Sequence, residues 1–291
     1  MPDVSNSEPS RLGTLIGVGV GPGDPSLMTI SAYRSILAAD LVVAPSANTG
    51  HSGRAEKVVR HYFPYLNIQR LYFPTTSTNH RVPSSLEAML SFQEAALQLR
   101  EPLESGENVV FVTLGDPNLY STFTTLTRAV RRILPNVKTR TIPGIMAFQV
   151  LAARSGTPLA CDEQSLEIIT AHRSVHKLDE ALKKKGHTIV VYKSGHSLEE
   201  IASILSRHGR LEGAEVGELL GMPEESYGDL QEFLEPSSPR TSYFTTILIP
   251  PLQEEEEPLG GRADDDIEKS PTARSRHVSK RIPSKDGDGL Q

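Results

Sequence analysis

The sequence predicts an α/β protein, with two α/β domains, a cleft between them and a disordered C-terminal tail. Three observations predict this architecture. Apolar, β-branched runs alternate with segments of helical periodicity, a glycine–aspartate–proline turn follows two of these runs, and the composition changes near Leu252. A chain of 291 residues is long enough for two compact units. We predict a disordered N-terminus at residues 1–12, domains at residues 13–134 and 135–251, and a disordered tail at residues 252–291.

The first predicted domain alternates strands with helices. Residues 14–20 form an apolar run typical of a buried strand, and Ser84 and Glu87 have the spacing of a helix capping box. Further strands are expected at residues 41–44, 68–73 and 108–114, and helices at residues 26–39, 53–62, 84–100 and 119–134. This alternation predicts a mostly parallel sheet.

The second predicted domain begins near Leu134. Strands are expected at residues 138–142, 166–170, 188–192, 213–219 and 243–249, and helices at residues 145–155, 175–184 and 198–207. The later elements, including the last strand, predict a sheet of mixed character. Beyond it, acidic runs at residues 254–257 and 264–266 and a basic segment at residues 274–281 bury too little apolar surface to offset the entropy of ordering them.

Composition excludes several function classes. The net charge of −6 argues against binding to bulk nucleic acid, which needs a basic face. Cys161 is the single cysteine, so no intramolecular disulfide and no thiolate metal cluster can form. The first eleven residues lack the apolar stretch of a secretory signal, and no apolar run is long enough to cross a membrane. We therefore expect a cytoplasmic protein with no membrane partner.

Familiar nucleotide and metal motifs are absent from the sequence. A dinucleotide fingerprint that starts at Gly17 requires a glycine at position 22, which is Pro22. One that starts at Gly19 requires a glycine at position 24, which is Asp24. No P-loop, no G-x-S-x-G elbow and no paired His or Cys motif for zinc is present. The scattered histidines, His51 among them, are expected on the surface. We predict no protein-bound metal.

The two glycine–aspartate–proline turns are the candidate binding site. Residues 19–25 and residues 115–117 each follow a predicted buried strand, at the edge where open α/β sheets bind ligands. Gly115 lets the backbone approach a ligand closely. Asp116 supplies negative potential to a positively charged cofactor, for which a sulfonium such as S-adenosylmethionine is suitable, or it caps the following helix. Asp24 has the same two alternatives.

Five segments in order along the chain resemble the tetrapyrrole methylase family. Residues 17–25 read GVGVGPGDP, residues 114–122 read LGDPNLYST, residues 141–145 read TIPGI, residues 190–193 read VVYK and residues 243–247 read YFTTI. Within the family, the second segment and residues 221–225 are most similar to precorrin-2 C20-methyltransferases. The resemblance spans about residues 13 to 249.

The resemblance implies an S-adenosylmethionine-dependent methyltransferase that converts precorrin-2 to precorrin-3A in cobalamin biosynthesis. It also implies a homodimer with the methyl donor in the cleft. Carried over by position, the donor contacts are Pro22, Gly115, Asp116, Leu119, Met146 and Ala147. We nominate Asp116 as the catalytic residue as well, and as partners for the carboxylates of the tetrapyrrole we nominate Arg54, Arg81 and Lys193. The alternatives are a cobalt-factor II C20-methyltransferase, a uroporphyrinogen III methyltransferase, or a donor-binding regulatory module.

Overall fold

A computed structural model of the chain describes residues 12–48, 51–74, 84–171, 175–184, 186–235 and 244–252. Its first sheet contains five parallel strands in the order β3-β2-β4-β1-β5. They are β1 (Thr14–Gly19), β2 (Leu41–Ser46), β3 (Ile68–Tyr72), β4 (Asn108–Thr113) and β5 (Lys138–Ile142). Because Gly19 of β1 is the partner of Thr113 of β4, these neighbouring strands end at the same level.

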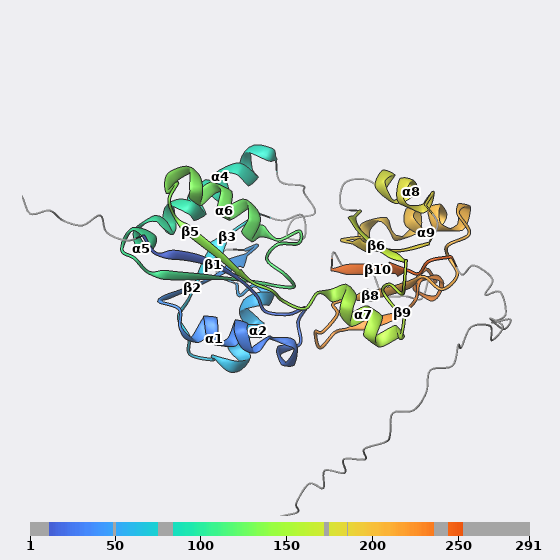
Figure 1. The fold of residues 1–291 in the computed structure, drawn as a ribbon, viewed down its shortest axis with the longest axis horizontal. Helices are drawn as coiled ribbons and strands as arrows, with labels where there is room; N and C mark the ends of the chain where they lie inside the picture. Colours follow the sequence, from blue (N-terminus) through green and yellow to red (C-terminus); the bar gives the residue numbers. More distant parts are fainter. Residues whose placement is uncertain are drawn as a thin grey trace, which may run out of the picture. The chain divides into compact units, whose positions relative to one another are not determined.

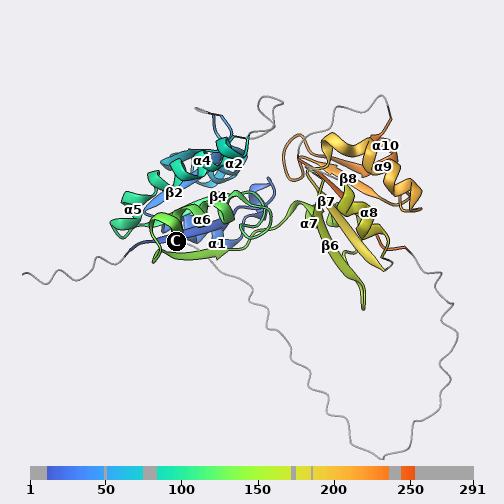
Figure 2. The same cartoon turned by 90° about the horizontal axis from the view of Figure 1, so that it is seen from above.

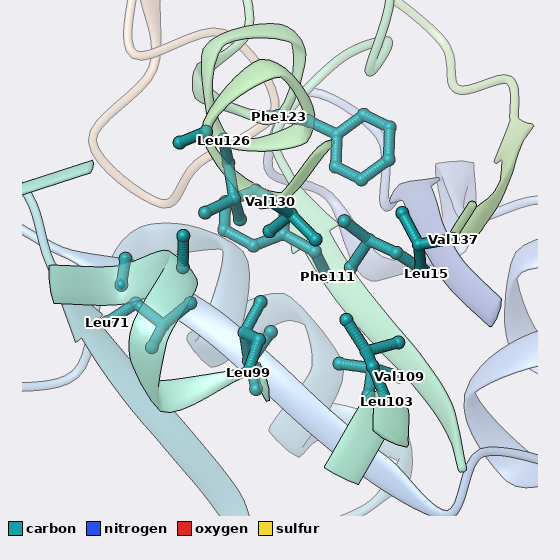
Figure 3. Packing of buried hydrophobic residues seen from close by; sticks show 14 of the residues in the cluster. Leu15, Leu71, Leu99, Leu103, Val109, Phe111, Phe123, Leu126, Val130 and Val137 are labelled. Carbon is teal, nitrogen blue, oxygen red and sulfur yellow. The ribbon is translucent and has the colours of Figure 1, made fainter. Parts of the chain in front are cut away.

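Helices cover both faces of this sheet (Figure 1). One face carries α4 (Ser85–Gln98), α5 (Arg100–Glu104) and α6 (Thr122–Ile133), and the other carries α1 (Ile30–Leu37) and α2 (Arg54–Tyr62). Figure 3 shows the core under the first group, where the buried ring of Phe111 lies 5.8 Å from that of Phe123. Each large apolar side chain buried in this way stabilises the fold by about 2 kcal/mol.

The second sheet has the order β6-β7-β10-β8-β9. Its strands are β6 (Ser165–Thr170), β7 (His187–Tyr192), β8 (Glu215–Glu218), β9 (Ser226–Asp229) and β10 (Thr245–Ile249). The β6–β7 pair is parallel and the other three pairs are antiparallel. The prediction of an α/β fold with a parallel first sheet and a mixed second sheet is therefore confirmed. The strand at residues 138–142 was predicted together with the strands of the second domain, but it is β5, which pairs with β1 at the edge of the first sheet. Its own sequence pattern does not show which sheet it joins.

Four helices pack on the second sheet. One face carries α7 (Ala147–Ser155), and the other carries α8 (His176–Leu182), α9 (Leu198–Arg207) and α10 (Leu230–Phe233) (Figure 2). Two short 3-10 turns, Pro25–Leu27 and Gly195–Ser197, complete the described elements. Of the two ends predicted to be disordered, all but Leu12 and Leu252 lie outside the described residues.

Two helices begin later than predicted. The helix expected at residues 26–39 is α1, which starts at Ile30 because the hydroxyl of Thr29 accepts the N–H of Ala32 at 3.1 Å. The helix expected at residues 119–134 is α6, which starts at Thr122, after Ser121 accepts the N–H of Phe123 at 3.1 Å. The predicted capping box is present, with Ser84 and Glu87 bonded to each other's backbone N–H groups.

Candidate active site

Three backbone turns meet at the carboxyl ends of β1, β4 and β5. The N–H of Gly115 donates to the carbonyl oxygen of Gly21 at 2.9 Å, which joins the two glycine–aspartate–proline turns directly. A Cβ atom at Gly19 or at Gly144 would lie within 2.3 Å of the carbonyl oxygen of Gly115. Because no side chain fits in that space, the turns pack backbone against backbone and present a surface of peptide groups.

The carboxylate of Asp116 bonds two of these turns together. One oxygen accepts the N–H of Asn118 at 2.8 Å, and the other accepts the N–H of Gly144 at 3.1 Å. The N–H of Asp116 itself lies 2.9 Å from Sδ of Met146. The cap of α6 is Ser121, so Asp116 does not have the capping role that was its alternative. Asp24 does cap, because its carboxylate accepts the N–H of Ser26 at 2.8 Å at the start of the first 3-10 turn.

A cavity of about 730 Å³ opens beside the turns, within the range typical of small-molecule sites. Both sheets contribute to its wall, since Thr113 of β4 and Thr245 of β10 both line it. The candidate donor contacts that line it are Pro22, Gly115, Leu119, Met146 and Ala147. Asp116 is not among the lining residues, because its carboxylate is directed to the backbone of the turns.

The cavity wall carries positive charge. His51, Arg54 and Lys57 lie at or just before the first turn of α2, and Lys193 follows β7. Among the described residues that line the cavity there is no aspartate or glutamate, although the chain as a whole has a net charge of −6. Arg81, the third candidate for substrate binding, lies outside the described residues. The cavity is therefore suited electrostatically to an anionic ligand.

Arg54 connects the two sheets at this wall. Its Cζ atom lies 4.0 Å from the centre of the Phe244 ring, a cation–π contact, and its Nη1 atom lies 3.5 Å from Sδ of Met222. Burial lowers the pKa of Arg54, and the charge of Glu224 raises it. Its guanidinium stays protonated at neutral pH, because the ordinary pKa of arginine lies far above 7.

Two tyrosines also line the cavity. The rings of Tyr120 and Tyr192 meet edge to face at 6.4 Å. The Tyr192 hydroxyl accepts the N–H of Phe148 at 3.3 Å, and burial raises the pKa of this phenol. Both rings supply apolar surface with a polar tip, which is usual in ligand sites.

Sequence reasoning missed several lining residues. His51 was expected on the surface; its side chain is exposed, and it also lines the cavity. Lys57, Tyr120, Tyr192 and Phe244 were not singled out. A signal was available for three of the basic residues, since His51, Arg54 and Lys57 recur every three residues, the spacing that brings side chains to one side of a helical segment.

The described residues contain neither a metal-binding cluster nor a membrane-spanning helix. No group of three or more His, Cys, Asp or Glu side chains in this part of the chain is arranged to hold a metal ion. None of the helices in the same part combines the length and apolar character that crossing a bilayer requires.

Fold and site define a class of protein. Residues 14–233 match the family described as Tetrapyrrole (Corrin/Porphyrin) Methylases, and the chain belongs to this family. The resemblance noted in the sequence is thereby confirmed at the level of the family. Solved structures with the same fold include uroporphyrin-III C-methyltransferase from Thermus thermophilus complexed with S-adenyl homocysteine, with a TM-score of 0.57 and 21% identity over 81% of this chain and 97% of that one.

Three named relatives are similar over most of this chain. Cobalamin biosynthesis protein CobIJ from Mycobacterium tuberculosis is 35% identical over 69% of this chain, which spans only 39% of that protein's length. Cobalt-precorrin-2 C(20)-methyltransferase from Salmonella typhimurium is 30% identical over 81% of this chain and 96% of its own length. Precorrin-2 C(20)-methyltransferase from Sinorhizobium sp is 29% identical over 82% of this chain and 96% of its own length.

Proposed function

We propose that this protein transfers a methyl group from S-adenosylmethionine to C20 of precorrin-2 and yields precorrin-3A, S-adenosylhomocysteine and a proton. One observation carries the proposal: a cavity shared by both sheets joins a wall of tightly packed glycine turns to a wall of cations without a described carboxylate. The first wall is suited to a compact nucleoside-containing donor and the second to a substrate rich in carboxylates. The similarity to two C20-methyltransferases supports the same reaction.

The residues present suit the methyl donor. Gly115 has φ +64°, and a Cβ there would lie 2.8 Å from Sδ of Met146, so the main chain is open to a ligand only while this position is glycine. S-adenosylmethionine supplies an electrophilic methyl group on a positively charged sulfur. In our proposal Pro22, Gly115, Leu119, Met146 and Ala147 contact the donor, and Asp116 acts as a positioning residue by fixing the turns.

The methyl transfer depends more on the alignment of the two reacting carbons than on acid–base catalysis. The electron pair of the meso carbon forms the new C–C bond as the C–S bond breaks, and the leaving thioether is neutral, so no general acid is needed. The proton on C20 is then lost to solvent or to a base. The chain contributes by holding the two reacting carbons in line and by keeping water away from a charge that disperses in the transition state.

Whether the macrocycle carries cobalt is a second question. The cobalt-precorrin-2 and precorrin-2 enzymes are similar to this chain to almost the same degree, 30% and 29%. We propose the metal-free substrate and keep the cobalt form as the alternative, and assays with both substrates distinguish the two.

Incubation with labelled S-adenosylmethionine and each candidate tetrapyrrole tests the proposal. Precorrin-2, its cobalt form and uroporphyrinogen III are compared, and the product's mass and labelled carbon are determined. We expect one added methyl group at C20 of precorrin-2. Labelling of another carbon, or of uroporphyrinogen III alone, contradicts the C20 assignment. Tight donor binding without turnover on any of the three indicates a regulatory module instead.

A further inference from the structure

The guanidinium of Arg54 has two side-chain contacts but no carboxylate partner within the described part of the chain. The Phe244 ring and Met222 Sδ touch it from the second sheet, at 4.0 Å and 3.5 Å. Neither contact neutralises its charge. Glu224 is the acid whose charge acts on it, yet the two form no ion pair within 4 Å. A half-buried cation in this state gains most by binding an anion from the cavity that it faces.

The acidic residue that follows Arg54 in α2 is already engaged by other arginines. Glu56, two residues further along α2, is fully buried and accepts hydrogen bonds from Arg60 at 2.8 Å and from Arg70 at 2.7 Å. Those bonds tie α2 to β3 and leave Glu56 occupied away from Arg54. The positive charge of Arg54 is therefore directed to the cavity.

A close backbone contact just before Arg54 fixes the position at which α2 begins. A Cβ atom at Gly53 would lie 2.2 Å from the carbonyl oxygen of Pro45, so the chain packs directly on the end of β2 immediately before Arg54. Pairing of β2 with β4 stops at Val43, and Pro45, which has no N–H, lines the cavity beyond that point. The backbone contact fixes the start of α2 next to β2, and the Phe244 ring contacts the guanidinium at the other end of the side chain.

We infer that Arg54 binds a carboxylate of the substrate and that Phe244 holds its guanidinium in place, so that this pair sets which edge of the macrocycle faces the methyl donor. The inference rests on the proposed function. An exposed cation such as Lys57 attracts a polyanion without fixing its direction, whereas a planar guanidinium packed on a ring offers a fixed fork of donors. Arg54 thereby becomes a residue that determines the specificity of methylation.

Binding of uroporphyrin III, an octacarboxylate tetrapyrrole, tests the inference without turnover. Quenching of its fluorescence gives dissociation constants for the wild type, Arg54→Met, Arg54→Lys, Phe244→Leu and Phe244→Tyr. We expect Arg54→Met to weaken binding about tenfold, Phe244→Leu about threefold, and the two conservative variants to retain most of the affinity. Calorimetry with S-adenosylhomocysteine, expected to be unchanged in all four, excludes a general loss of structure.

A matched control and a double variant make the result decisive. Arg128 is an exposed arginine of α6 outside the cavity lining, so Arg128→Met removes the same charge and is expected to bind uroporphyrin III like the wild type. In the Arg54→Met background, Phe244→Leu is expected to cost nothing further, because the ring acts through the guanidinium.

Several outcomes overturn the inference. The first is that the wild type does not bind uroporphyrin III. The second is that Arg54→Met binds it as tightly as Arg128→Met does. The third is that Phe244→Leu lowers the affinity equally with and without Arg54. Failure of the proposed function has a different signature. In that case the expected binding pattern is kept, but the wild type transfers no methyl group to precorrin-2.

Discussion

The hydroxyl of Tyr120 donates a hydrogen bond of 2.9 Å to the carbonyl oxygen of Ile168. Tyr120 lies in the turn after β4, and Ile168 lies in β6, so the bond joins the turn of the first sheet to the second sheet. The backbone of Tyr120 has φ +51°, a left-handed conformation that a residue with a side chain adopts at some cost. Burial raises the pKa of the phenol, so it remains a donor at neutral pH.

Replacing Tyr120 by phenylalanine should remove this bond and keep the ring beside Tyr192. We expect the free energy of unfolding to fall by about 1 kcal/mol, the usual net value of one hydrogen bond. Denaturant titration measures the change. Tyr227→Phe is the matched control, because Tyr227 is similarly exposed and lies outside the cavity lining. Equal stability of the two variants would mean that the bond to Ile168 contributes nothing.

Asp116→Asn should loosen the turns. An asparagine has one acceptor oxygen, whereas Asp116 accepts from both Asn118 and Gly144, so one backbone N–H loses its partner. We expect a loss of about 2 kcal/mol of stability and weaker donor binding, measured by thermal unfolding and calorimetry. Asp24→Asn should cost much less, because the amide oxygen can still accept from Ser26. Lost turnover with unchanged stability and donor affinity would instead assign Asp116 a direct catalytic contact.

Gly144→Ala should separate the turns. The new Cβ would lie 2.2 Å from the carbonyl oxygen of Gly115 and 2.8 Å from the backbone of Gly19, so the backbone on both sides must move. We expect at least a tenfold loss of donor affinity by calorimetry, because in our proposal the donor contacts these peptide groups. Gly156→Ala is the control: its φ of +72° adds backbone strain, but no atom lies within 4 Å of the new Cβ. If Gly144→Ala binds the donor normally, the turns are not the donor wall.

Glu56 should make stability depend on acid pH. The hydrogen bond from Arg70, followed by the bond from Arg60, lowers the pKa of this buried carboxyl from 4.5. A lowered native pKa means that the stabilisation is complete above pH 4.5 and is lost as the pH falls through the native pKa. Glu56→Gln should therefore cost about 3 kcal/mol at pH 7 and flatten the acid limb of the stability curve.

A pH series of denaturant titrations measures this effect. Glu104→Gln is the comparison, because its ion pair with Arg100 is exposed and should contribute under about 0.5 kcal/mol. An acid limb as steep in Glu56→Gln as in the wild type would show that other carboxylates carry the dependence.

Sequence patterns predicted the fold wherever burial alone decides the structure. The runs at β1 and β4 are apolar except at their ends, so their place in the middle of a parallel sheet follows from composition. β9 was missed because its Ser-Tyr-Gly-Asp sequence is short and polar, and it is a strand only through its pairing with β8. Similarly, Tyr120 was placed in a helix because no local pattern reveals a positive φ.

Part of the candidate site could also be predicted from the sequence. Glycine turns that follow buried strands are typical of places where the backbone approaches a ligand. This pattern indicated Gly115 and its neighbours. Phe244 could not be found in that way, because its role comes from a contact with Arg54, 190 positions away in the sequence. Contacts of that kind depend on how the two sheets are brought together. The residue periodicity within one strand or helix does not predict them.

The place of β10 has a consequence for synthesis on the ribosome. β10 is the last described strand in chain order, yet it lies in the middle of its sheet, between β7 and β8. All five strands of the first sheet have been synthesised once Ile142 is translated, so that half can fold while translation of the second half continues. β8 and β9 must wait for residues 245–249 before they are joined to β6 and β7, and until then the nascent polypeptide exposes two strand pairs with open edges.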